Sequence, residues 1–461
     1  MSNNRSILIS LLIFISVSAL LAMPFIFLPA ESLSTYGKIS ILTLGVLVLL
    51  IAVKYFIPSL IGVSRPADVE DLKRFPFVSI IISVYNEEKV LPRTIESLLA
   101  LDYPQDRIEF IYVYEEKCTD HSEEIILSYA RSDPRVKPLK RAMSPEDKVV
   151  ANPKADSMNY GLEHARGEIV GFLDADHSLA KGAIQRAIYW LDKDEVACVR
   201  GRIRAINKEE TFLAKLVGVE RDIAECLSAY GNFLLGGFTH FPGGQGFFRR
   251  EIFQKIGLFN HDMLVEDIDF SARVHENGYE IVVDPGISSW EEVPATLSSL
   301  WKQRIRWSLG WMQCAIKHFI PTFKSKMPRS KQLDIAFCWS STFLTVITTF
   351  CIPMIIINAA LLHGTSYFGP FLHTFGIFCG VTPSVTIGLI LTCDYLEGES
   401  FRWDEILCMP IFLPYLIALS FISFSAFVVK FILRSRISFI KTPKSGYNEL
   451  VETPVVCAKL E

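Results

Sequence analysis

Four short apolar runs in the middle of the chain predict buried β-strands. They span residues 77–84, 108–114, 168–173 and 195–203. Because each run is almost continuously apolar rather than alternating, we expect the strands to be covered on both faces. The intervening segments, such as 88–104 and 154–167, carry apolar residues three and four positions apart and end in proline or glycine. This order of elements predicts a parallel, doubly wound α/β sheet.

Longer apolar stretches on both sides of this region predict membrane-spanning helices. Residues 7–30 contain no Asp, Glu, Lys or Arg, and a second apolar stretch at 39–61 follows at once. The first stretch is long enough for the ~20 residues that cross a bilayer. It is too long for the apolar part of an ordinary signal peptide, which is the alternative interpretation. Residues 335–393 are also uncharged, and 406–429 form a last apolar stretch.

Basic residues orient these segments. Lys54 and Arg65 lie near the end of the second stretch, so the positive-inside rule places the α/β region in the cytosol. The basic segment at 433–441 is expected there too, but three C-terminal crossings would leave it outside. Either one stretch is re-entrant, with Pro410 and Pro414 as candidates, or the crossings are divided differently.

Composition excludes several classes of function. The net charge is −4 and no basic patch is interleaved with aromatic residues, so nucleic acid is not an expected partner. The ten cysteines lack metal-ligand spacing and are interpreted as reduced packing residues. The sequence has no GxxxxGK[ST] motif, which argues against a P-loop ATPase.

Polar residues follow three of the predicted strands, where ligands bind in sheets of this kind. They are Tyr85, Asn86 and Glu87 after the first, Glu115 and Glu116 after the second, and Asp174, Asp176 and His177 after the third. Several acids in one crevice repel each other unless a cation lies among them. The pattern therefore predicts a divalent metal ion with oxygen ligands and room for substrate phosphates.

Six motifs then occur in order along the chain. They are "SVYNE", "KADSMN", "DADH", "FPGGQGFFRRE", "LVEDIDF" and "QRIRW". The set resembles the membrane-embedded family 2 glycosyltransferases that include cellulose, chitin and hyaluronan synthases, over roughly residues 77–319 and the C-terminal tail. The resemblance implies a GT-A (Rossmann-like) fold, a UDP-linked sugar donor and Mg²⁺ or Mn²⁺ as cofactor.

The resemblance also implies roles for individual residues. Asp176 is expected to bind the metal with help from His177, and Asp267, beside Glu266, is expected to be the catalytic base. Trp307, Gly243 and Gly244 are expected to face the acceptor. The remaining residues are expected to contact the nucleotide sugar: Tyr85, Glu87, Glu115, Glu116, Lys154, Asp174, Gln303, Arg304, Arg306, Thr442 and Lys444.

The chemistry agrees with these residue types. A leaving diphosphate needs positive charge, which a metal, Lys154 and Arg306 supply, and a carboxylate such as Asp267 accepts the proton of the attacking hydroxyl. One base without a second carboxylate nucleophile implies inversion at the anomeric carbon. Structural alternatives stay open, because Trp307 and Trp311 are spaced to anchor a helix at a membrane surface. Equally, Glu266 and Asp267 stand at a helix start, where acids are favoured.

Two segments depart from the family pattern or extend it. Family members commonly carry Asp-Asp where this chain has Glu115 and Glu116, which leaves recognition of the base open. The segment "FIKTPKSG" resembles the gating loop of cellulose synthases, with Thr442 and Lys444 at the matching positions. An ordinary basic segment beside the membrane is the alternative.

These observations predict a cytosolic GT-A domain inserted between transmembrane helices. The predicted regions are a membrane hairpin at 1–65, the GT-A domain at 66–290, interface helices at 291–333, a membrane region at 334–433 and a cytosolic tail at 434–461. The predicted function is processive synthesis of a β-linked polysaccharide at the plasma membrane, with transfer of the polymer across it. Addition of one sugar to a lipid acceptor is the alternative. An inactive scaffold is disfavoured because the motif residues are retained.

Overall fold

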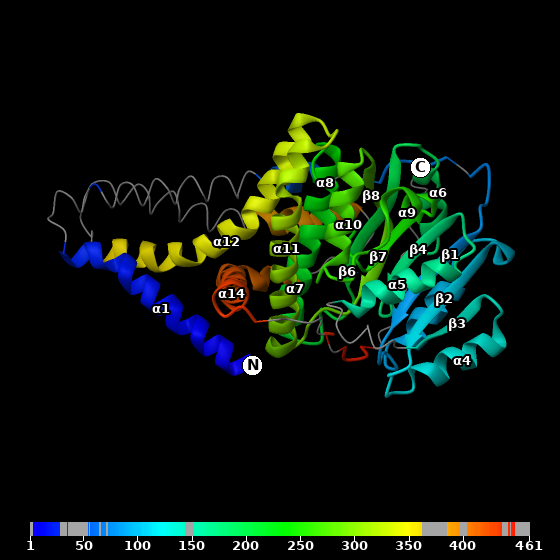
Figure 1. Cartoon of the computed structure of the whole chain (residues 1–461), viewed down its shortest axis with the longest axis horizontal. Coiled ribbons are helices and arrows are strands. Elements are labelled where there is room, and N and C mark those ends of the chain that lie inside the picture. The colour runs from blue at the N-terminus through cyan, green and yellow to red at the C-terminus, as the bar shows by residue number, and fades with distance from the viewer. Residues whose placement is uncertain are drawn as a thin grey trace.

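The structure is a computed structural model and describes most of the chain. It covers residues 3–27, 35, 54, 56–63, 66–70, 72–142, 152–361, 385–396, 403–435, 441–442 and 444–447. Of the predicted membrane segments, residues 39–53 and 362–384 lie outside the described residues. A sheet domain and a group of long helices lie next to each other (Figure 1).

The sheet domain contains eight strands in the order β3-β2-β1-β4-β7-β6-β8-β5. The strand prediction is confirmed for β1 (Val78–Val84), β2 (Ile108–Glu115), β4 (Ile169–Asp174) and β6 (Val196–Ala205). The other four were not predicted: β3 (Val136–Arg141), β5 (Ser178–Leu179), β7 (Gln245–Arg249) and β8 (Glu280–Glu291). β3 is a polar edge strand with a proline, and "DPG" within β8 is typical of a turn, so neither carries the usual strand signal.

The prediction of a wholly parallel sheet is wrong. Strand β7 runs antiparallel to both β4 and β6, and β5 runs antiparallel to β8. Before β7 the chain lies at the edge of the sheet where β4 ends. There the Asp174 amide donates a hydrogen bond to the Gly244 carbonyl at 3.0 Å. A strand that starts at this edge must run in the opposite direction. Apolar runs report burial and not direction, so sequence reasoning could not detect the reversal.

Helices cover both faces of the sheet, as expected for strands apolar on both sides. On one face α3 (Leu91–Leu99), α4 (Ser122–Ser132) and α6 (Ala183–Leu191) pack on Ile80 and Ile82. On the other face α5 (Pro153–His164), α9 (Glu251–Ile256) and α10 (Glu266–Glu276) pack on Ile81. Successive strand residues thus enter two separate cores.

A second group of helices lies beside the carboxyl edge of β6 (Figure 1). Helix α7 (Phe212–Asp222) continues as the π-helix η3 (Ile223–Ser228) and α8 (Ala229–Leu234). The long α11 (Leu297–Lys324) and α12 (Arg329–Leu361) follow β8. The chain returns with η4 (Trp403–Cys408), α14 (Met409–Phe427) and η5 (Val428–Ile432), and α1 (Asn3–Phe27) packs on α12 and α14.

Ion pairs attach the returning segment to the sheet domain. Arg204, at the end of β6, pairs with Asp394 at 2.7 Å. Lys208 pairs with Glu405 at 2.7 Å and also with Asp222 of α7. All of these side chains are buried, so each charge depends on its partner. The chain just before α14 is therefore held against the sheet domain.

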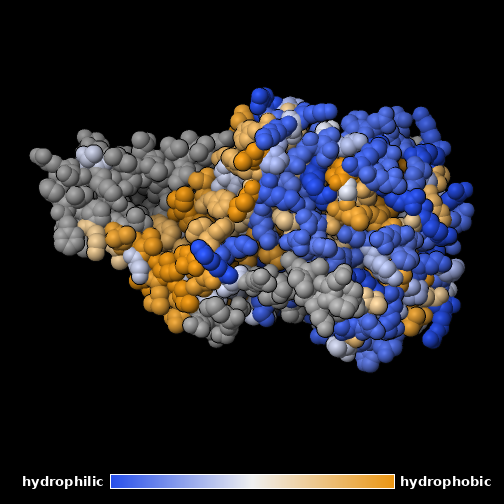
Figure 2. All heavy atoms as spheres, viewed as in Figure 1, coloured by the Kyte–Doolittle hydropathy of each residue, from blue (hydrophilic) through white to orange (hydrophobic). Residues whose placement is uncertain are grey.

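Apolar side chains gather on the helical part of the surface. Figure 2 shows them over α1 and α12, whereas hydrophilic residues cover most of the sheet domain. Leu8, Leu12, Ile15 and Leu20 of α1 are more than half exposed. Within the described residues, the stretch Pro414–Ile432 is long and apolar enough to cross a membrane, whereas Ser6–Leu20 and Val385–Leu396 are apolar but shorter. Core helices of soluble proteins share these properties.

The aromatic core on the α5 side generates a stability prediction. Phe172 is 1% exposed, and its ring centroid lies 5.0 Å from Phe259 and 5.7 Å from Phe248. We expect Phe172→Ala to lower the free energy of unfolding by about 3–5 kcal/mol, because it leaves a cavity among packed rings. Chemical denaturation followed by near-UV circular dichroism measures this. Phe212→Ala, at a position 47% exposed, is the control. Equal effects of both substitutions would contradict the assignment of this core.

Candidate functional site

A deep pocket lies at the carboxyl edge of β1, β2 and β4 and extends to α7 and α11. The structure brings together on its wall most residues predicted from the sequence. They are Tyr85, Glu87, Glu115, Lys154, Asp174, Asp176, Gly243, Gly244, Glu266, Asp267, Gln303, Arg304, Arg306, Trp307, Thr442 and Lys444. Two are not on the wall: Glu116 is exposed, and His177 is fully buried behind Asp176.

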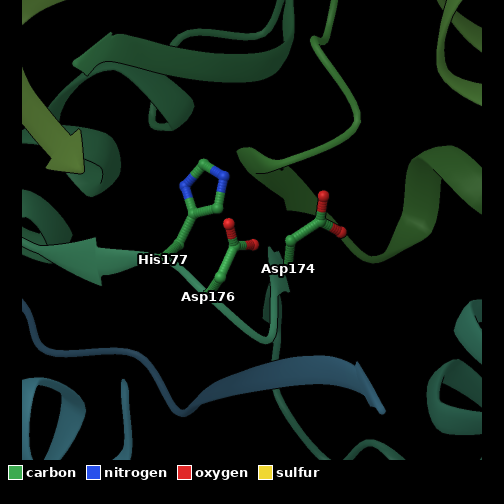
Figure 3. A group of neighbouring side chains, drawn as sticks. All are labelled: Asp174, Asp176 and His177. Carbon is green, nitrogen blue, oxygen red and sulfur yellow. The ribbon is translucent and has the colours of Figure 1, made fainter. Parts of the chain in front are cut away.

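Asp174, Asp176 and His177 form a group that could hold a metal ion (Figure 3). One ligand atom from each lies within 4.8 Å of the others, in the turn that ends β4. Carboxylate oxygens and an imidazole suit Mn²⁺, and oxygen ligands alone suit Mg²⁺. His177 already uses both ring nitrogens, with Nδ1 3.3 Å from Ser289 Oγ and Nε2 3.2 Å from Glu291 Oε2.

Lys154 lies between the two acidic parts of the pocket. The Asn152 side chain caps α5 by accepting the Lys154 amide at 3.2 Å, and Pro153 fits the first helical position. The Lys154 ammonium contacts Asp174 at 2.5 Å and the Gly243 carbonyl at 3.0 Å. Burial alone lowers the pKa of Lys154, but Asp174 and Glu266 outweigh it and raise that pKa. A full positive charge is therefore fixed in the pocket.

Glu266 and Asp267 begin α10. Glu266 is 3% exposed and accepts from the Asn152 side chain, whereas Asp267 lines the pocket. Burial and the neighbouring Glu266 raise the pKa of Asp267 to about 7, against the lowering effects of Lys154 and Arg306. The Asp267 carboxyl can therefore gain and lose a proton near neutral pH.

Two glycines let the loop before β7 approach these acids. A Cβ added at Gly243, which has a φ of 77°, would lie 2.7 Å from Asp267 Oδ2. A Cβ added at Gly244 would lie 2.5 Å from His177 Nε2. Both distances are shorter than those between non-bonded atoms in a packed protein. Only glycine therefore fits at either position without displacing a site residue.

Helix α11 supplies the other wall of the pocket. Thr296 caps its start by accepting the Ser299 amide at 3.3 Å. Trp307 lies beside two guanidinium groups, with its ring centroid 4.6 Å from Arg304 Cζ and 5.8 Å from Arg221 Cζ. The side-chain oxygen of Gln303, Oε1, has no hydrogen-bond partner within the part of the chain that the structure describes. Gln303 thus presents an unsatisfied polar atom next to an aromatic face.

The end of β1 forms the opposite wall. Asn86 adopts a left-handed conformation with φ of 55°, and its side chain accepts the Thr119 amide at 2.8 Å. This turn directs Tyr85 and Glu87 into the pocket. Burial raises the pKa of Glu87 to about 7, although Lys441 opposes the rise. Glu115 pairs with Lys117 at 2.8 Å.

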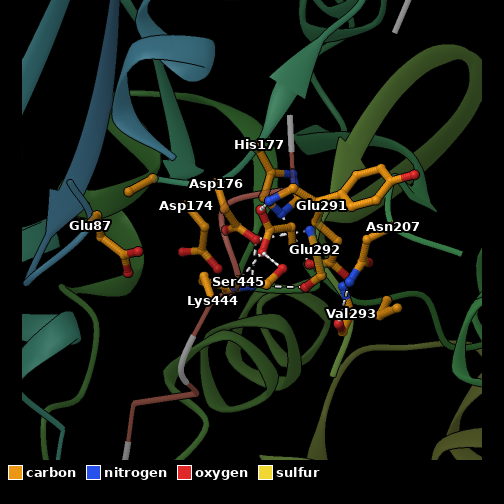
Figure 4. A network of polar contacts seen from close by, with 12 residues as sticks. Glu87, Asp174, Asp176, His177, Asn207, Glu291, Glu292, Val293, Lys444 and Ser445 are labelled. Atoms are coloured by element: carbon orange, nitrogen blue, oxygen red, sulfur yellow. Dashed lines mark hydrogen bonds and ion pairs between the residues drawn. The ribbon is translucent and has the colours of Figure 1, made fainter. Parts of the chain in front are cut away.

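The C-terminal tail lies against this side of the pocket (Figure 4). Lys444 pairs with Asp176 and donates to the Glu292 carbonyl at 3.0 Å. Lys441 pairs with Glu87 at 2.9 Å. The Glu292 carboxylate accepts the amides of Ser445 at 2.9 Å and Tyr447 at 2.8 Å. The tail therefore places a cation on the same carboxylate that could hold a metal.

Sequence reasoning missed the charged residues at the far end of the pocket. Glu220, Arg221 and Glu225 come from α7 and η3, and Glu291 comes from the end of β8. The pair of acids in "WEEVP" was the only available signal, but it follows no uninterrupted apolar run. The α7 residues belong to an amphipathic helix, where charges usually face solvent.

Comparison with known proteins identifies the sheet domain. Residues 79–257 match Glycosyl transferase family 2, and residues 169–396 match Glycosyl transferase family group 2. This chain carries a family 2 glycosyltransferase domain. The matched ranges contain Asp174, Asp176, His177, Lys154 and the acids of α10, so the family 2 glycosyltransferase part of the predicted resemblance is confirmed for this domain.

Relatives of the glycosyltransferase domain differ in the product that their names state. Poly-beta-1,6-N-acetyl-D-glucosamine synthase of Staphylococcus epidermidis is 30% identical over 251 residues, or 54% of this chain and 58% of that protein. Beta-monoglucosyldiacylglycerol synthase of Nostoc sp. is 26% identical over 262 residues, or 56% of this chain and 54% of that protein. The matched part is thus less than two thirds of the length of these relatives.

A solved structure supports the fold assignment. The mannosyltransferase PcManGT from Pyrobaculum calidifontis, solved with GDP-Man and Mn²⁺, has a TM-score of 0.52 and is 20% identical. The likeness covers 78% of this chain and 99% of that one. The GT-A fold is therefore confirmed for the sheet domain. Enzymes with this fold commonly depend on a divalent metal, and the Asp174, Asp176 and His177 group is consistent with one.

The close approach of Gly244 to His177 generates a prediction about metal binding. We expect Gly244→Ala to weaken Mn²⁺ binding by about 10- to 100-fold, because the added methyl group displaces the imidazole beside Asp176. Titration followed by electron paramagnetic resonance of free Mn²⁺ measures the affinity. Gly182→Ala is the matched control, since its Cβ would lie 3.8 Å from the nearest side chain. Unchanged affinity in Gly244→Ala would argue against a metal at this group.

Proposed function

We propose that the protein is an inverting, metal-dependent glycosyltransferase. It transfers a hexose or an N-acetylhexosamine from a UDP-sugar to a growing β-linked polysaccharide and passes the polymer across the plasma membrane. The observation that carries this proposal is Asp267, whose pKa of about 7 suits a base, in one pocket with fixed positive charge and an aromatic face. The roles assigned to individual residues belong to the same proposal.

The donor occupies the part of the pocket next to β1, β2 and β4. Tyr85, Glu87 and Glu115 contact the base and ribose, and the diphosphate lies beside Lys154 and Arg306. Asp176, with help from Asp174 and His177, would hold a divalent ion, which when bound would supply further positive charge for the leaving group. Gln303, Arg304, Thr442 and Lys444 complete the predicted donor contacts. The positive charges of these groups then offset the mutual repulsion of the carboxylates in the donor part of the pocket.

Asp267 accepts the proton of the acceptor hydroxyl as that hydroxyl attacks the anomeric carbon. Glu266, the acid next to Asp267, is 3% exposed and already accepts a hydrogen bond from the Asn152 side chain, so we assign it no role as a nucleophile. A single displacement inverts the configuration and gives a β-linkage from an α-linked donor. Glu266 contributes by raising the pKa of Asp267.

The acceptor sugar stacks on Trp307, next to Gly243 and Gly244. His240 lies near Trp311, with ring centroids 5.7 Å apart. Burial, with Arg200 and Arg221, lowers the pKa of His240 to about 3, so this ring stays neutral. Neutral aromatic faces suit the apolar face of a pyranose. The N-acetylglucosamine polymer named for one relative supports a polysaccharide acceptor.

The second candidate function is addition of one sugar to a lipid. A relative named as a glucosyldiacylglycerol synthase favours it. The extensive apolar surface over the helices is equally suited to holding a lipid acceptor.

Exposed apolar residues on α1, α11 and α14 support a membrane location. The basic residues Lys54 and Arg65 favour a cytosolic sheet domain. The chain contacts the sheet domain immediately before α14, through Glu405, and after it, through Lys441 and Lys444. We therefore place α14, which contains Pro414, along the membrane face and not across it. An α14 in this position leaves the tail cytosolic and accounts for the uneven count of crossings.

An assay with labelled UDP-sugars tests the proposal. We expect detergent-purified protein with Mn²⁺ to convert label from UDP-glucose or UDP-N-acetylglucosamine into high-molecular-weight product. Asp267→Asn and chelation of the metal should both abolish this, and added Mn²⁺ should restore only the chelated enzyme. Asn277→Asp, on the exposed end of α10, is the control. Label found only in the organic phase would establish the lipid-glycosylating alternative, and no transfer from any UDP-sugar would refute both.

The raised pKa of Asp267 predicts the pH dependence of the reaction. A base acts when deprotonated, so the rate should rise with pH through about 7 and level off above it. Below that value we expect the rate to fall about tenfold per pH unit. Initial rates between mildly acidic and mildly alkaline pH at saturating donor measure this. A profile that is flat across neutrality would contradict Asp267 as the base.

A further inference from the structure

We infer that Glu291 is a positioning residue that holds the metal-binding end and the acceptor end of the pocket in a fixed relation. The inference rests on the proposed function, since it gives the two ends of the pocket their meaning. Glu291 is the last residue of β8, and its carboxylate lies beside His177 (Figure 4). The same carboxylate accepts a hydrogen bond from Arg221.

On the metal side, Glu291 fixes the imidazole of His177. Its Oε2 lies 3.2 Å from His177 Nε2, while Ser289 Oγ lies 3.3 Å from the other ring nitrogen. His177 follows Asp176 directly and is fully buried, so its ring can turn only by breaking one of these contacts. The backbone amide of Glu292 also donates to Asp176 Oδ2 at 3.1 Å. The end of β8 thus determines where this turn lies.

On the acceptor side, Glu291 fixes the guanidinium of Arg221. Arg221 Nε donates to Glu291 Oε1 at 2.7 Å, and a second guanidinium nitrogen contacts the same carboxylate. Arg221 then lies beside Trp307, with Cζ 5.8 Å from the ring centroid. A cation near an aromatic face is attracted to it, and the attraction grows when water is excluded. The carboxylate of Glu291 therefore helps to position Arg221, which lies next to Trp307, the proposed platform for the acceptor sugar.

These contacts are well shielded from water. The side chains of Glu291 and Arg221 are each 14% exposed, and that of His177 is 0% exposed. In such surroundings an ion pair is screened weakly, and the removal of one partner leaves the other charge uncompensated. A displacement of His177 is transmitted through the shared carboxylate to Arg221. Coupling of this kind is reciprocal, so a change at Trp307 also acts on the metal-binding turn.

Neighbouring acids provide a matched comparison. Glu220 holds the other guanidinium beside Trp307, because Arg304 donates to it through two nitrogens at 2.8 and 2.9 Å. Within the described residues, Glu220 forms no hydrogen bond or ion pair with Asp174, Asp176 or His177, and it instead accepts from the Tyr415 hydroxyl at 2.5 Å. Substitution of Glu220 should therefore disturb Trp307 locally without disconnecting it from the donor end.

The experiment observes Trp307 while the donor end is filled. The full-length protein is labelled with 5-fluorotryptophan, and the Trp307 resonance is assigned by its loss in Trp307→Phe. Fluorine NMR spectra are then recorded with Mg²⁺, with and without UDP at a concentration that saturates each variant. We compare the wild type with Glu291→Gln, Arg221→Lys and Glu220→Gln. Glu291→Gln keeps the size of the side chain but removes its charge, and Arg221→Lys breaks the link if Glu291→Gln does not fold.

We expect UDP to shift the Trp307 resonance in the wild type and in Glu220→Gln, and to leave it unshifted in Glu291→Gln and Arg221→Lys. A shift that persists in both of the latter variants would overturn the inference. So would loss of the shift in all three variants, or UDP binding by the wild type without any shift. Absence of UDP binding to the wild type in a parallel calorimetric titration would instead refute the proposed function.

Discussion

Carboxylates crowd the carboxyl edge of the sheet, and each one needs a positive partner. Asp174 has Lys154, Asp176 has Lys444, Glu87 has Lys441 and Glu115 has Lys117. An unpaired negative charge inside a protein is costly, so each of these lysines stabilises the carboxylate that it contacts. Asp267 is buried next to another acid, Glu266, and its raised pKa follows first from burial and then from that neighbour. Asp267 differs from these paired acids because no lysine or arginine forms an ion pair with it among the described contacts, whereas Glu87, whose pKa is also about 7, pairs with Lys441.

The reversal of strand β7 brings the remaining groups to this edge. Because β7 starts where β4 ends, the loop before it passes between the metal-ligand turn and the start of α10. Gly243 and Gly244 permit the approach, since a side chain at either position would overlap Asp267 or His177. A wholly parallel sheet would have started this strand at the opposite edge, away from the acids.

The helical part of the protein completes the pocket and meets the membrane in our proposal. Helix α7 continues into a π-helix, a rare form that often occurs at functional sites. From this helix Arg221 reaches Trp307 of α11, while buried ion pairs at Arg204 and Lys208 hold the returning segment against the sheet domain. The acceptor end is thus built from elements far apart in the sequence, and its geometry depends on how the helices pack.

The sequence by itself predicted four of the eight strands, and its resemblance to a known family supplied the GT-A fold and most of the site residues that the structure brings to the pocket wall. The strands and the polar residues that follow them are local features, since continuous apolar runs predict buried strands and polar residues after parallel strands lie at one edge. Only the tertiary structure decided the direction of β7, the burial of His177 behind Asp176, and the contacts of Glu291 with both His177 and Arg221. The physical reason is that strand direction, burial of charge and pairing of distant side chains depend on which segments meet in space. A single sequence contains no local pattern that specifies those meetings.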